Sequence, residues 1–139
     1  MTATPSRWPV TAVFFLNGLL LSSYIVRVPA IKSDLHLTAG QLGLTGTLFA
    51  GAAIVAMQFV GPVAARVGSA RLIRFALVAM PLTVAAIGLS RGLVAFAVAA
   101  IFTGAVHGSL DVAMNAYAVA VEQARRRPIL SGCHAADRS

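Results

Sequence analysis

Apolar residues run along this 139-residue chain in four long blocks, and short segments that carry basic residues separate the blocks. Blocks of this kind predict membrane-spanning helices, because about 20 apolar residues cross a bilayer at about 1.5 Å per residue. We expect an all-α membrane protein in which residues 1–121 form one four-helix bundle and residues 122–139 form a basic tail. The expected spans are residues 8–26, 42–65, 72–90 and 92–121.

The composition of the chain also indicates a lipid environment. Hydrophobic residues make up 58% of the chain and charged residues 11%, whereas soluble domains carry about 25% charged residues. The net charge of +7 would suit a nucleic-acid partner. However, the basic residues lie between and beside the apolar blocks, and the sequence has no basic patch with interleaved aromatic residues. We therefore expect the lipid bilayer, and no nucleic acid, as a partner.

The basic residues are distributed unequally between the two ends of the expected bundle. One end holds Arg27, Lys32 and Arg91, and the other holds Arg7, Arg66, Arg71, Arg74, Arg125, Arg126, Arg127 and Arg138. Positive residues favour the cytoplasmic side of a membrane. We therefore expect both termini in the cytoplasm and the protein in a bacterial inner (plasma) membrane, and residues 122–139 form a cytoplasmic tail.

Local signals mark the expected helix ends and contacts. Thr38 and Gln41 have the spacing of a capping box, which predicts that the second helix begins after Thr38. Pro29 and Pro128 are expected to end the first and the fourth helix, because proline lacks the backbone N–H that continues a helix. The Gly-x-x-x-Gly step at 104–108 predicts close packing of the fourth helix on a neighbour.

Candidate chemistry lies in the fourth span, where His107, Asp111 and Asn115 follow one another at intervals of four residues. This spacing places the three side chains in one polar stripe along the helix. A carboxylate at membrane depth is costly and usually marks a substrate or proton pathway. Asp111 is therefore the first candidate for a pathway, followed by Asn115 and His107. Alternatively, the stripe only joins helices, with Asn17 of the first span as its partner.

Other kinds of site find no support in the sequence. His36, His107 and His134 are far apart along the chain, so we expect no metal site and no cofactor. The lone Cys133 cannot form a disulfide within the chain. No phosphate-binding loop is present, and no nucleophile, base and orienting group come together. We therefore expect no enzyme activity.

The segment between the second and third spans resembles the cytoplasmic signature loop of the major facilitator superfamily, G-x-x-x-D-R-x-G-R-R. Gly61, Arg66 and Gly68 match the motif in kind and spacing, and Arg71 lies one position after the place of its last arginine. Ala65 occupies the position of the usual acidic residue, so the charge relay that the family attributes to that residue cannot operate in the usual way.

The fourth helix and the residues after it resemble, more specifically, the MosC-like branch of this superfamily. The resemblance rests on the runs 111–115 and 127–131, and the likeness to the superfamily covers residues 9–135. Complete members have twelve spans in two six-helix halves, with the site at the midplane between them. Four spans correspond to one three-helix repeat and one further helix. The resemblance therefore implies an N-terminal part of such a protein, with the C-terminal helices missing.

The function expected from these patterns is that of the N-terminal part of a secondary active transporter, which moves a small polar solute by alternating access. We expect this part to be inactive alone, and we expect the DNA after the Ala135 codon to encode further apolar blocks in another frame. A small four-helix multidrug exporter acting as a dimer is one alternative, although such proteins depend on a carboxylate in the first span, which is absent here. A membrane scaffold without transport activity is another.

Overall fold

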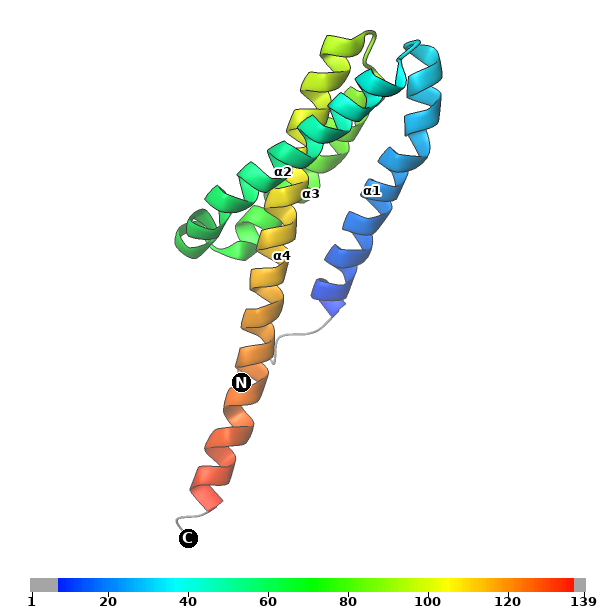
Figure 1. Ribbon diagram of the computed structural model, residues 1–139. Coiled ribbons are helices and arrows are strands. Elements are labelled where there is room, and N and C mark those ends of the chain that lie inside the picture. The colour runs from blue at the N-terminus through cyan, green and yellow to red at the C-terminus, as the bar shows by residue number, and fades with distance from the viewer. Residues whose placement is uncertain (1–7, 137–139) are drawn as a thin grey trace.

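The computed structural model describes the chain from Trp8 to Ala136, with side chains described as far as Ala124. Four helices form in this part of the chain, and each is long and apolar enough to cross a membrane (Figure 1). This confirms the prediction of an all-α membrane protein with four spans. The helices are α1 (Trp8–Asp34), α2 (Ala39–Val67), α3 (Ser69–Gly88) and α4 (Leu93–Ala136).

The prediction that prolines end two of the helices was wrong. Pro29 lies inside α1, which continues to Asp34, and Pro128 lies inside α4, which continues to Ala136. A proline removes one helical hydrogen bond, whereas leaving the helix would free several backbone groups at once. As a result, α4 extends well past the turn between α2 and α3 (Figure 1), and helix replaces the predicted break at the start of the tail.

The connection between α1 and α2 contains the predicted capping box. The backbone N–H of Thr38 donates to Oε1 of Gln41 at 2.9 Å, and the backbone N–H of Gln41 donates to Oγ1 of Thr38 at 3.2 Å. Both donors belong to the start of α2, where no helical carbonyl is available to them. The capping-box prediction is confirmed, and it fixes the beginning of the second span.

A single residue, Gly68, joins α2 to α3 and has a φ of 94°. L-residues with a side chain rarely adopt this left-handed conformation, which glycine reaches at little cost. Its N–H donates to the carbonyl oxygen of Ala64 at 2.9 Å and so closes the last turn of α2. Gly68 therefore permits the two long helices to reverse direction with almost no loop.

Helix α4 is the centre of the bundle and packs mainly along α2 and then along α3. The close approach to α2 occurs at Gly104 and Gly108. A Cβ on either glycine would overlap the backbone of α2, coming within 2.9 Å of the carbonyl carbon of Phe49 or of Ala53. This confirms the predicted Gly-x-x-x-Gly contact, because only glycines let the two backbones lie so near to each other.

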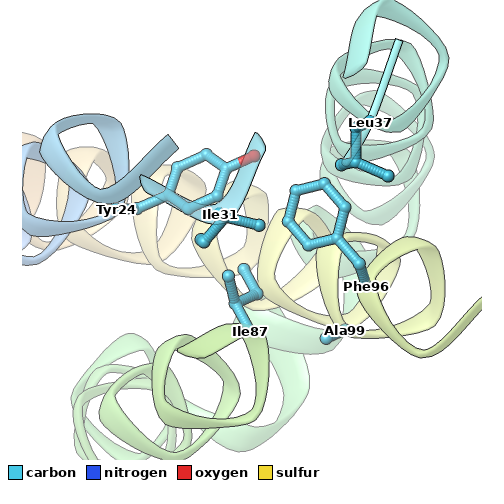
Figure 2. Close-up of a cluster of buried hydrophobic side chains, with 6 residues drawn as sticks. All are labelled: Tyr24, Ile31, Leu37, Ile87, Phe96 and Ala99. Carbon is cyan, nitrogen blue, oxygen red and sulfur yellow. The ribbon is translucent and has the colours of Figure 1, made fainter. Parts of the chain in front are cut away.

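Two apolar clusters hold the helices together at opposite ends of the bundle. The first joins the α1–α2 connection and the end of α3 to α1 and α4. Its side chains converge in Figure 2: Tyr24, Ile31, Leu37, Ile87, Phe96 and Ala99. The second joins α3 to α4 near the start of α1, with buried Ile73, Ala76, Leu110, Ala113 and Met114. The middle of the bundle lies between these clusters.

Helix α1 lies apart from the other three helices along much of its length (Figure 1). Its buried side chains are Asn17, Tyr24 and Ile31, which are seven residues apart. A seven-residue repeat places side chains on one narrow seam of a helix. Helix α1 therefore meets the bundle along a single line of contacts, which passes through a polar residue.

The predicted topology rests in part on arginines that the structure does not describe. Arg7 and Arg138 lie beyond the described residues, and the side chains of Arg125–Arg127 are not described either. Within the described part, the α1–α2 and α3–α4 connections lie at one end of the bundle and the α2–α3 connection at the other (Figure 1). The assignment of these ends to the two sides of the membrane remains a prediction.

Candidate functional site

A polar contact joins α1 to α4 between the two apolar clusters. Nδ1 of His107 lies 3.2 Å from Oδ1 of Asn17, which is a hydrogen-bond distance. Asn17 is only 7% exposed, and His107 is partly buried. The amide oxygen of Asn17 is an acceptor, so the contact requires the imidazole tautomer with its proton on Nδ1. The structure thus brings His107 of the predicted stripe together with Asn17, the partner expected for the stripe in the first span.

Two aromatic rings adjoin this contact. The ring of Phe49 in α2 lies 5.9 Å from the imidazole of His107 and is tilted by 31°. Phe49 also stacks on Tyr24, with 5.4 Å between ring centroids and 11° between ring planes. No pattern in the sequence indicated a role for Phe49. The spacing of Gly104 and Gly108 indicated a close neighbour for α4 but carried no information on which residue of α2 it would meet.

Asp111 lies one turn beyond His107 on α4 and is partly buried. Its position along the bundle follows from the packing of α2 and α4. The neighbouring Gly108 contacts Ala53, which is the central residue of α2. Asp111 is three residues from Gly108, or about 4.5 Å along the helix axis. Among the residues that the structure describes, the carboxylate has no hydrogen-bond or ion-pair partner. It is therefore a free acceptor near the middle of the bundle.

Asn115 has a different environment from the rest of the predicted stripe. Its side chain is exposed, and its Nδ2 donates to the backbone carbonyl oxygen of Asp111 at 2.8 Å. Such a bond to the preceding turn of the same helix satisfies the amide locally. The four-residue spacing drifts around the helix by about 40° at each step, so the stripe turns from the α1 contact at His107 to the outer surface at Asn115.

The grouped atoms can bind a polar solute or a proton. Nδ2 of Asn17 and Nε2 of His107 have no partner in the described part of the chain, and neither do the carboxylate oxygens of Asp111. The amide nitrogen of Asn17 can donate to a hydroxyl or a carbonyl, whereas Nε2 of the neutral imidazole accepts from a hydroxyl. A carboxylate can accept from a hydroxyl or take up a proton. These are the capacities required of a transport site in a membrane.

The signature segment is mostly helical and not a loop. Gly61 and Arg66 lie within α2, Arg66 in its last turn, while Arg71 lies in the first turn of α3. Among these four residues, only Gly68 lies outside a helix. Ala65 is exposed beside Arg66, and its methyl group cannot pair with either arginine.

Comparison with known proteins agrees with these features. The model of the Major Facilitator Superfamily matches residues 10–136. An uncharacterized transporter of Sinorhizobium fredii, y4wD, is 34% identical over 132 residues, which cover 95% of this chain and 35% of that protein. An uncharacterized MFS-type transporter of Yersinia pestis is 32% identical, over 87% of this chain and 32% of its own length.

The membrane protein MosC of Rhizobium meliloti is 28% identical over 89% of this chain and 32% of its own length. The chain thus spans about a third of the length of the curated relatives that it matches. No solved structure matches it significantly. The match over residues 10–136 covers all four spans, including the Asn17–His107 contact and Asp111. The chain therefore belongs to the Major Facilitator Superfamily, with MosC among its relatives.

Proposed function

We propose that this chain is the N-terminal part of a secondary active transporter that moves a small polar solute by alternating access. The relatives named as transporters support the general activity. The observation that carries the proposal is the free carboxylate of Asp111 near the middle of the bundle, one turn from the Asn17–His107 contact. The protein resides in the inner membrane with both termini in the cytoplasm, as the distribution of basic residues favours.

Asp111 is the proton or solute site in this proposal. A carboxylate within a membrane span is costly, and it persists where a cavity, a partner or a transported species compensates for the cost. No partner compensates for it in the described bundle. The transported solute or proton, together with water in the pathway, would supply that compensation in the working protein.

Asn17 and His107 position the solute beside Asp111. Their contact holds α1 against α4 at 3.2 Å while Nδ2 of Asn17 and Nε2 of His107 stay available for hydrogen bonds. Few other contacts hold α1 in place. Small movements of α1 relative to α4 would then open and close access to Asp111, as alternating access requires.

Transport by this site requires helices beyond the four described. In complete transporters of this kind, two halves move around a shared central site, and the chain covers about a third of each matched relative. We therefore propose that these 139 residues do not transport alone. A chimera in which residues 1–136 replace the matching third of the Sinorhizobium relative would supply the remaining helices.

Thiol labelling of this chimera tests the proposed pathway. In a Cys133→Ser background without other cysteines, Asp111→Cys should react with a membrane-impermeant thiol reagent. Phe102→Cys is the matched control, because Phe102 lies on the same helix, is 61% exposed and would face lipid. Equal and slow labelling of both cysteines in a chimera that purifies as a single species would refute a water-accessible pathway at Asp111.

A further inference from the structure

A cavity of about 240 Å³ lies between α1, α3 and α4 at the end of the bundle where α1 begins. Its walls are apolar, with Val10 and Val13 from α1, Ile73 from α3 and Met114 from α4. Ile73 and Met114 also belong to the apolar cluster that joins α3 to α4, so the floor of the cavity is a fixed part of the core. This cavity is separate from the Asn17–His107 contact.

Arg74 supplies the charge of this cavity. It lies in the second turn of α3, and its Nε donates to the carbonyl oxygen of Ala70 at 3.3 Å. This bond directs the side chain back toward the start of α3, as expected for an arginine that reaches from a span to the membrane surface. The two outer guanidinium nitrogens have no partner in the described chain. They therefore remain available at the rim of the cavity.

Tyr117 of α4 also lines the cavity and carries a hydroxyl group that can donate a hydrogen bond. The cavity thus combines an apolar floor with a cationic and a hydroxyl donor from two different helices. A guanidinium with two free nitrogens matches the geometry of a phosphate group. A ligand with a phosphate and an apolar tail would satisfy both parts of the cavity.

Charge at this end of the bundle favours an anionic ligand. Arg66, Arg71 and Arg74 lie there, in the last turn of α2 and the first two turns of α3. Among the described residues, Glu122 is the acid at the same end. Basic cavities between membrane helices bind the headgroups of anionic lipids.

We propose that this cavity is a binding site for an anionic phospholipid such as phosphatidylglycerol. Its phosphate is held by the guanidinium of Arg74 and the hydroxyl of Tyr117, and its acyl chain lies against Val13, Ile73 and Met114. The lipid fills the space between α1 and the α3–α4 pair, where α1 makes few contacts of its own. It therefore holds the start of α1 in place.

Lipid retention by the full 139-residue chain tests this proposal. The chain is reconstituted in nanodiscs of equal parts phosphatidylglycerol and phosphatidylcholine and extracted into mild detergent, and the co-purifying lipids are quantified by mass spectrometry. Phosphatidylglycerol should be enriched about fivefold, the effect of one arginine near the membrane surface. Arg74→Gln should remove this enrichment, whereas Arg74→Lys should retain most of it.

Arg71→Gln is the matched control, because it removes the same charge from the same helix outside the cavity. It should leave the enrichment nearly unchanged. Val13→Phe fills the apolar part of the cavity, keeps every charge, and should also remove the enrichment. Circular dichroism of each variant checks that the helices are formed. If one of the variants at Arg74 and Val13 misfolds, the other still tests the proposal.

Two results would overturn the proposal. Equal losses in Arg74→Gln and Arg71→Gln would mean that total charge, and not this cavity, attracts the lipid. Displacement of the bound lipid by soluble glycerol 3-phosphate, together with an unchanged enrichment in Val13→Phe, would mean that the site binds a free phosphate compound without an acyl chain.

Discussion

Oδ1 of Asn17 lies 3.2 Å from Nδ1 of His107, and this contact crosses from the first to the fourth helix between residues 90 positions apart in the sequence. It occurs on the single seam along which α1 meets the bundle. A polar contact on a narrow seam sets the register of α1 against α4, because sliding by one turn would leave a buried amide without its partner.

A double-mutant cycle measures how much this contact contributes. Asn17→Leu and His107→Leu should each lower the free energy of unfolding, and the coupling between them should be about 0.6 kcal/mol and at most about 1.7 kcal/mol, as for other hydrogen bonds between membrane helices. Unfolding in mixed detergent micelles gives the values. Ser22→Ala is the control, since Ser22 is exposed on α1, and a coupling energy near zero for the Asn17–His107 pair would contradict the register role.

Gly108→Ala should separate α2 from α4. The added Cβ would overlap the backbone of Ala53, and overpacking of this kind costs about 1–3 kcal/mol. The same change at Gly51 of α2 meets no atom within 4 Å and should leave stability nearly unchanged or slightly higher. Thermal unfolding in detergent compares the two variants, and equal stability would show that the helices can move apart without cost.

Asp111→Asn should abolish proton coupling while it preserves insertion in the membrane. The amide keeps the shape of the carboxylate but cannot take up a proton. Uptake by the chimera with the Sinorhizobium relative, measured across a range of pH, should fall sharply and lose its pH dependence. Asn115→Ala serves as the control, because Asn115 is exposed and bonded to its own helix. Wild-type uptake with an unchanged pH profile in Asp111→Asn would assign the residue to helix packing.

Cysteine labelling from either side of the membrane tests the topology. Cysteines near Lys32 and Arg91 should react from outside, and those near Arg71 and Arg126 from inside, because the end with more basic residues faces the cytoplasm. Each cysteine is introduced into a Cys133→Ser background, so that the labelling reports on the introduced thiol alone. Labelling near Arg71 from the outer side would reverse the proposed orientation.

Local features of this protein followed from the sequence alone. The four spans are set by runs of apolar residues whose length matches a bilayer. The capping box at Thr38 depends on residues three positions apart, and the glycines at 104 and 108 face the same side of α4 wherever that helix packs. Each of these features depends on near neighbours in the chain, so the pattern of residues is sufficient to predict it.

Relationships between helices required the tertiary structure. The sequence placed His107, Asp111 and Asn115 on one stripe, but only the packing of α1 against α4 separates the contact at His107 from the exposed amide of Asn115. It also brought Phe49 beside His107. The helical conformation of Pro29 likewise depends on the whole helix around it. Side chains on a helix repeat every 3.6 residues whatever lies opposite, so the pattern defines a face, and the neighbouring helices decide which part of that face is buried.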